Sequence, residues 1–192
     1  MAAAMDAFME LGFAQTSTLE IATRAQVSKR ELYSLFGSKQ AILAVCVSER
    51  AQRMRLPPDI PMARTRDELA EVLVRLGSTL LTEICNPHVV GVFRLAISEA
   101  QAAPEVARTL DMARQSVRTA VREVIAKAHS AGLLGAADPD QMSGEYLSVL
   151  WGDLQLNLLL RLREAPAPAE AQRRAQHAVS VLLQLHPADQ KL

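Results

Sequence analysis

Hydrophobic residues recur every three or four positions along most of the chain, the spacing that places them on one side of an α-helix. Residues 67–85 show this clearly, with Leu69, Val72, Leu73 and Leu76 in register. No stretch shows the strict alternation that is typical of a half-buried strand. The pattern predicts an all-α protein of about nine helices, over residues 1–11, 18–25, 29–36, 39–55, 67–85, 88–102, 105–131, 139–163 and 169–185.

Two short helices in residues 17–39 begin with the same capping signal. Glu20 follows Ser17 by three residues, and Glu31 follows Ser28 by three, which is the spacing of a capping box. Gly37 is expected to end the second helix as a left-handed residue. The apolar positions of both helices and of their connection should face a common core, namely Ile21, Ala22, Ala25, Val27, Leu32, Leu35 and Phe36.

The opposite side of the second short helix is polar and cationic. It carries Lys29, Arg30, Tyr33 and Ser34, and a helix-turn-helix presents such a face to the DNA major groove. Glu31 allows two interpretations. It completes the cap, which the spacing favours, or its carboxylate accepts a hydrogen bond from a cytosine amino group.

Lys39 stands in the first turn of the next helix, behind a capping Ser38. A cation is mildly unfavourable at this positive end of the helix dipole. We therefore expect Lys39 to bind a DNA phosphate.

Residues 12–39 contain Gly12-Phe13, Thr16-Ser17, Ile21-Ala22, Val27-Ser28, Leu32-Tyr33, Phe36 and Ser38-Lys39. In the identity, order and ungapped spacing of these residues, the sequence resembles the TetR family of bacterial transcriptional regulators. The family usually has Gly where Gln26 stands and a small residue where Glu31 stands. It also usually has several residues, often basic, before its first helix, so we expect a truncated or misassigned start, or weaker contacts to the DNA backbone.

The resemblance implies a homodimer whose two heads bind a near-palindromic operator in duplex DNA. A small-molecule effector would then release the operator. The middle of the chain, Phe93 to Ala100 with Pro104-Glu105, also resembles the AefR-like subgroup of this family. The residues expected at the DNA are Ser17, Thr18, Ser28, Lys29, Arg30, Tyr33, Ser34 and Lys39.

Prolines in residues 56–62 predict a domain boundary, because they interrupt a helix. A DNA-binding domain with its connecting helix would occupy residues 1–55, and an effector-binding and dimerisation domain residues 56–192. The resemblance implies a ligand cavity in the second domain. Large side chains either line that cavity or belong to an ordinary core, with Asn157 as the polar partner: Phe93, Met112, Tyr146, Trp151, Leu154 and Asn157.

The last two predicted helices carry more apolar surface than one neighbour can cover. Leucines recur every four residues from Leu150 to Leu162, and a second stripe follows in residues 169–185. We expect these helices to pair with their copies in a symmetric dimer, with packing inside one chain as the alternative. The expected interface residues are Leu150, Leu158, Leu162, Ala175, Val179 and Leu182.

Charge and composition narrow the function. The 192 residues carry 21 Lys and Arg against 21 Asp and Glu, which excludes a polycation that coats nucleic acid non-specifically. The charge is uneven, because residues 1–55 hold seven Lys and Arg against five Asp and Glu. This local excess of positive charge can attract DNA phosphates although the net charge of the whole chain is zero.

No catalytic motif is present: the sequence lacks a phosphate-binding Gly loop, G-x-S-x-G, C-x-x-C and H-E-x-x-H. We therefore expect neither an enzyme nor a cofactor. Cys85 and His88 form a lone C-x-x-H pair with too few ligands for a metal. The sequence has only two cysteines, which lie far apart, and it shows neither a signal peptide nor an apolar run of membrane length. These features predict a cytoplasmic protein.

Three alternatives remain open at this point. A helical small-molecule-binding protein would have no DNA activity, and a helical enzyme would turn over a substrate. Within the family, an activator is the alternative to a repressor.

Overall fold

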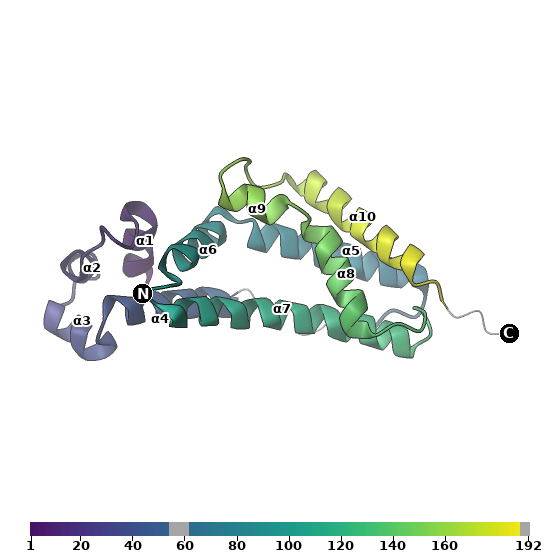
Figure 1. Cartoon of the computed structure of the whole chain (residues 1–192), viewed down its shortest axis with the longest axis horizontal. Coiled ribbons are helices and arrows are strands. Elements are labelled where there is room, and N and C mark those ends of the chain that lie inside the picture. Colours follow the sequence, from purple (N-terminus) through teal and green to yellow (C-terminus); the bar gives the residue numbers. More distant parts are fainter. Residues whose placement is uncertain (54–61, 189–192) are drawn as a thin grey trace. The chain divides into compact units, whose positions relative to one another are not determined.

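The computed structural model describes residues 1–53 and 62–188. Over these ranges the chain forms ten α-helices and no strand (Figure 1), which confirms the all-α prediction. The helices fall into two compact units, one within Met1–Arg55 and Pro87–Arg114, the other within Leu56–Asn86 and Gln115–Leu192. The prolines that predict the domain boundary lie outside the described residues.

The first unit is built on a small core beneath two short helices. Phe8 and Phe13 place their ring centroids 5.4 Å apart, and Ile21, Leu32 and Leu43 are buried around them. The elements of this unit are α1 (Ala2–Leu11), α2 (Thr18–Arg24), α3 (Lys29–Phe36), α4 (Lys39–Arg53), α6 (Pro87–Glu99) and the first part of α7 (Pro104–Ser130).

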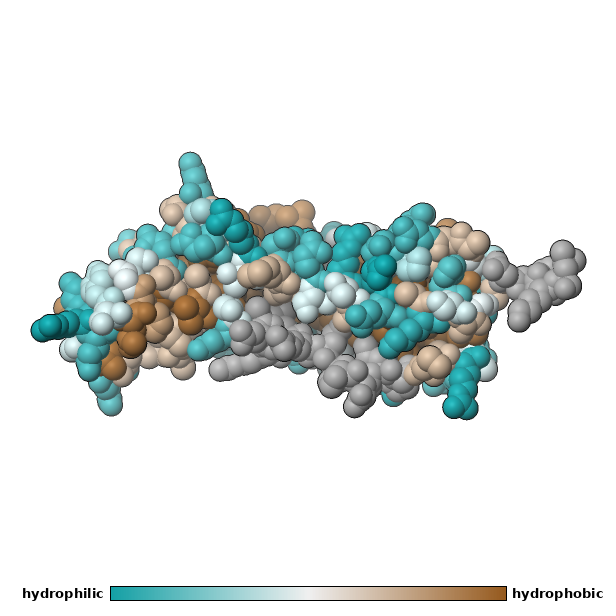
Figure 2. Space-filling model, turned by 90° about the horizontal axis from the view of Figure 1, so that it is seen from below, coloured by the Kyte–Doolittle hydropathy of each residue, from teal (hydrophilic) through white to brown (hydrophobic). Residues whose placement is uncertain are grey.

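Three apolar positions of α2, α3 and their connection do not enter this core. Leu35 is 74% exposed and Val27 is 40% exposed, and Ala25 is also exposed, so their predicted inward placement is wrong. A helix of two turns contacts its neighbours along a narrow line, which Leu32 and the half-buried Phe36 already occupy. Figure 2 shows hydrophobic residues at the surface among hydrophilic ones.

The second unit packs α10 (Pro168–Leu185) against both α5 (Arg66–Ile84) and α8 (Pro139–Trp151). Gly77 permits this close approach. A Cβ atom added there would overlap the Tyr146 hydroxyl oxygen and lie 3.1 Å from Ala175 Cβ. The buried Tyr146 hydroxyl donates to the Leu73 carbonyl at 2.7 Å, so α5, α8 and α10 meet at one point.

The helix predicted over residues 139–163 is in fact two helices. It begins as predicted, since Asp138 caps it by accepting from the Asp140 N–H at 3.0 Å. Gly152 then takes φ 47° and ends α8, a conformation that favours glycine. The chain resumes as α9 (Leu154–Leu159), which explains ten helices instead of nine.

Most of the predicted dimer residues are core residues of this same chain. Leu150, Leu158, Ala175, Val179 and Leu182 are all at most 5% exposed. Their burial within this one chain leaves them unavailable to a partner, and α10, which carries the alanine stripe, packs on α5 and α8. Of the six predicted interface residues, Leu162 is exposed, at 71%.

Among the described residues, no single helix is long and apolar enough to cross a bilayer. By length and composition only, α5 and α6 taken together could form a bent span.

Candidate nucleic-acid interface

The start of α3 is held by a complete capping box. The Glu31 N–H donates to Ser28 Oγ at 3.1 Å, and the Ser28 N–H donates to Glu31 Oε2 at 2.8 Å. Hydrogen bonding of the Glu31 carboxyl to the Ser28 side chain, and next to the Ser28 backbone N–H, lowers the pKa of that carboxyl. The capping interpretation of Glu31 is confirmed, and it fixes the direction in which the first turn of α3 points.

The face of α3 opposite the core is exposed and joined to α2. Lys29, Arg30, Tyr33 and Ser34 are all exposed, and Lys29 Nζ lies 5.7 Å from the centre of the Tyr33 ring. Thr18, at the start of α2, donates from its hydroxyl to the Tyr33 hydroxyl oxygen at 3.3 Å. Five of the eight predicted DNA residues therefore form one surface.

Ser17 begins α2 with half of a capping box. Its Oγ accepts from the Glu20 N–H at 3.0 Å, but the Glu20 carboxylate accepts from Arg24 Nε at 2.7 Å instead of returning to the cap. Arg24 also pairs with Glu10. Because two carboxylates neutralise it, Arg24 adds little to the cationic surface.

The turn between α2 and α3 is closed by a residue in the left-handed region. Gln26 has φ 56°, and the next N–H, that of Val27, donates to the Ala22 carbonyl at 3.0 Å. Left-handed backbone strains residues that carry a Cβ atom. This conformation explains why glycine is usual at the position.

Lys39 has partners inside the protein. Its ammonium group donates to the carbonyl oxygens of Phe13 at 2.7 Å and Thr16 at 2.9 Å, and it lies 4.3 Å from the centre of the Phe13 ring. Two of its three N–H donors are thus used within the loop that joins α1 to α2. These bonds account for a cation in the first turn of α4 without a phosphate.

Lys29 and Arg30 are the cations that remain at the start of α3. Neither forms an ion pair with another residue in the part of the chain that the structure describes. Two exposed positive charges at a capped helix start complement the negative charge of a DNA backbone. They can also donate hydrogen bonds to the acceptor edge of guanine.

Comparison with known families assigns the chain. Residues 71–186 match the family described as AefR-like transcriptional repressor, C-terminal domain, and residues 1–46 match that described as bacterial regulatory proteins, tetR family. The chain belongs to the TetR family. It is a bacterial, DNA-binding transcriptional regulator of a non-enzymatic family, so the predicted family, AefR-like subgroup and non-enzymatic nature are confirmed.

Individual relatives of this TetR-family protein are distant but nearly complete in coverage. The uncharacterized HTH-type transcriptional regulator YvkB of Bacillus subtilis (strain 168) is 21% identical over 168 residues, which covers 88% of this chain and 86% of YvkB. A TetR-family regulator structure from Mesorhizobium loti MAFF303099 has a TM-score of 0.80 at 20% identity, covering 96% of this chain and 93% of its own. The flavonoid-responsive regulator FrrA has a TM-score of 0.78 at 24% identity, covering 98% and 95%. At these identities the structural likeness shows a shared fold.

The six predicted ligand residues are divided between the two units. Phe93 and Met112 belong to the first unit and the other four, Tyr146, Trp151, Leu154 and Asn157, to the second. Met112 is 64% exposed, so its predicted place in an enclosed lining is wrong. Tyr146 already donates its hydroxyl hydrogen to the Leu73 carbonyl, and Asn157 donates to Asp153 Oδ2 at 2.8 Å.

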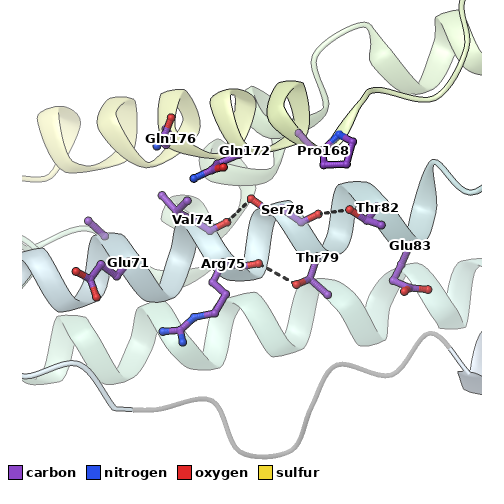
Figure 3. Close-up of a pocket in the computed structure, with 12 residues that line it drawn as sticks. Glu71, Val74, Arg75, Ser78, Thr79, Thr82, Glu83, Pro168, Gln172 and Gln176 are labelled. Carbon is purple, nitrogen blue, oxygen red and sulfur yellow. Dashed lines mark hydrogen bonds between the residues drawn. The ribbon is translucent and has the colours of Figure 1, made fainter.

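A groove of about 790 Å³ runs between α5 and α10 of the TetR-family second unit. None of the six predicted ligand residues lines it. The lining includes Ser78, Thr79 and Thr82 of α5 with Gln172 and Gln176 of α10. In Figure 3, Ser78 lies on the side of α5 toward Gln172, whereas Thr79 lies beside Arg75 on the side away from α10. Each hydroxyl donates to a carbonyl of its own helix, at 2.8–2.9 Å, so its oxygen remains available as an acceptor.

Proposed function

We propose that this regulator is a ligand-responsive repressor in the cytoplasm. A homodimer holds a near-palindromic operator through its two α3 helices and releases it when a small molecule binds the second unit. DNA reading is placed in residues 1–55, and effector binding with dimerisation in residues 56–192. The observation that carries the proposal is the exposed pair Lys29 and Arg30 at the capped start of α3.

In this proposal α3 enters the major groove with its first turn. Lys29 and Arg30 approach base edges or phosphates, while Thr18, Tyr33 and Ser34 contact the DNA backbone and set the register. Ser17 and Ser28 act mainly as caps, because their side-chain oxygens already accept backbone N–H groups. Two heads on half-sites one helical turn apart would stand about 34–36 Å from each other.

Lys39 acts chiefly inside the head. Its two hydrogen bonds to the α1–α2 loop and its position over Phe13 hold the start of α2 against the core.

The dimer would form through apolar side chains that the chain leaves uncovered near α9. Leu156 and Leu160 are 59% and 58% exposed and lie one helical turn apart, and Leu162 is 71% exposed. Exposed leucines in such proximity favour a partner surface. They replace the buried stripes as the proposed interface.

The groove between α5 and α10 is the proposed effector site. Its volume of about 790 Å³ falls in the range of small-molecule sites, about 300–1,000 Å³. The name of the fold relative FrrA, a flavonoid-responsive regulator, also favours a small-molecule effector. To release DNA, the effector must bind the released dimer more tightly than the DNA-bound one.

Selection of bound genomic fragments tests the proposal. The purified protein should retain a few discrete fragments from a digest of its source genome, each with a near-palindromic site, and a compound screen should find molecules that release them. Retention of no fragment at low ionic strength would contradict the proposal and support the alternative of a small-molecule-binding protein.

A further inference from the structure

A second hollow lies in the first unit, where α1, α4 and α6 border a cavity of about 210 Å³. Its lining is rich in sulfur. The whole chain holds seven methionines and two cysteines, and four of these nine residues line this one cavity, namely Met1, Met5, Met9 and Cys46. Its polar lining residues are Asp6, Glu49 and His88. The function proposed above uses none of them.

The sulfur atoms reach the cavity from more than one helix. Met1, Met5 and Met9 recur every four residues, so they share one side of α1 at steps of about 6 Å along its axis. The Met9 thioether lies at the crossing with α6, since a Cβ atom added to Gly91 would be 2.7 Å from Met9 Sδ. Cys46 reaches in from α4, with Sγ 3.8 Å from the Met1 carbonyl oxygen.

These methionines lie at the edge of the core of this unit. Met1 and Met5 pack against that core, as methionine often does. All three methionines are only partly buried, however, and border space that remains open. Cys46, by contrast, is 3% exposed. Burial raises the pKa of its thiol to about 11, so the free protein holds it as a neutral thiol.

The donor set selects among metal ions. Thioether and thiolate sulfurs are soft ligands that favour Cu(I), whereas zinc in proteins takes four N, O or thiolate ligands. Within residues 1–53 and 62–188, no group of three or more His, Cys, Asp and Glu could hold a metal ion. Asp6, Glu49, His88 and Cys46 border the cavity but are not grouped as a metal site of that kind. The methionine thioethers add the soft ligands that a Cu(I) ion takes.

We propose that this cavity binds one Cu(I) ion through the thioethers of Met5 and Met9 and the thiolate of Cys46, with Met1 and His88 at its margin. On binding, a Cu–S bond forms at Cys46 and the thiol proton passes to solvent. Copper stays in the +1 state throughout, so the step needs no oxidant or reductant. The site is independent of the proposed groove between α5 and α10.

Competition for Cu(I) tests this site on the full chain. The protein is titrated anaerobically into a chromophoric Cu(I)–bicinchoninate complex, and the affinity and stoichiometry are read from the loss of colour. We expect one ion per chain, and a loss of affinity of about tenfold or more, about 1.4 kcal/mol or more, in each of Met5→Leu, Met9→Leu and Cys46→Ala.

Matched controls remove sulfur elsewhere. Met62 is exposed and Cys85 is the other buried thiol, so Met62→Leu and Cys85→Ala should leave Cu(I) affinity unchanged. Thermal unfolding without metal checks that each variant is folded. The proposal is overturned if the wild type binds no Cu(I), if the two controls weaken binding as much as the cavity variants, or if Zn(II) binds as tightly as Cu(I). Because no DNA is present, this outcome is separate from that of the repressor proposal.

Discussion

Gly77 provides a quantitative test of how α5, α8 and α10 pack. In Gly77→Ala, the new Cβ would overlap the Tyr146 hydroxyl and crowd Ala175 Cβ at 3.1 Å and Leu150 Cδ1 at 3.2 Å. Overpacking a core costs about 1–3 kcal/mol, and disturbing the buried hydrogen bond of Tyr146 costs about 1–3 kcal/mol more. The higher helix propensity of alanine stabilises the folded protein by about 1 kcal/mol. The free energy of unfolding should therefore fall by about 1–5 kcal/mol.

Urea denaturation followed by circular dichroism measures this change, and Gly144→Ala is the control. Gly144 also lies within a helix, but a Cβ there would meet only Arg118 Nη2 at an ordinary 3.5 Å, so its unfolding free energy should stay equal or rise. Adding Tyr146→Phe removes the overlapped oxygen, so Gly77→Ala should cost less in that background. If Gly77→Ala and Gly144→Ala behave alike, the described packing is wrong.

Three further substitutions test local features. Gln26→Gly relieves left-handed backbone and should raise the unfolding free energy by about 1 kcal/mol; a loss of stability would refute the turn conformation. Lys39→Ala should lower the unfolding free energy by about 1.5–3 kcal/mol and leave the salt slope of DNA binding unchanged, whereas a slope reduced by about one would show a phosphate contact. A hydrogen bond with His186, then one with Gln141, lowers the pKa of Glu145. The ionised Glu145 carboxylate therefore stabilises the folded protein fully at pH values above the ordinary Glu pKa. This stabilisation is lost as the pH falls through the lower pKa that Glu145 has in the folded protein. Glu145→Gln should destabilise at pH 7 and match the wild type in acid; a pH-independent difference would contradict this.

Local signals in the sequence predicted the helix starts well, because caps depend on only a few neighbouring residues. Ser28 with Glu31 and Asp138 with Pro139 cap helices as predicted. Gly152 is likewise a local signal, in this case for the end of a helix. The leucine repeat continues on both sides of it, which is why one long helix was predicted. The left-handed turn at Gln26 could have been inferred from the family's preference for glycine there.

Features that depend on distant parts of the chain could not be predicted. A leucine repeat shows that a face is apolar, but whether its own chain or a partner covers it depends on the tertiary packing, as Leu150 and Leu156 illustrate with 0% and 59% exposure. Lys39 finds its partners 23 and 26 residues away in sequence. The sulfur-lined cavity likewise joins Met5 to Cys46 through the fold alone.

The central claim is that the start of α3 reads DNA, and one binding measurement tests it most directly. Fluorescence anisotropy with a selected operator fragment compares the wild type with a Lys29→Ala and Arg30→Ala double variant. A control double variant, Arg114→Ala with Lys127→Ala, removes the same charges from exposed positions on α7. Each lost base contact costs about 1–3 kcal/mol, so the α3 variant should bind at least about tenfold more weakly while the control keeps wild-type affinity. Equal affinity of the α3 variant and the wild type would contradict the claim.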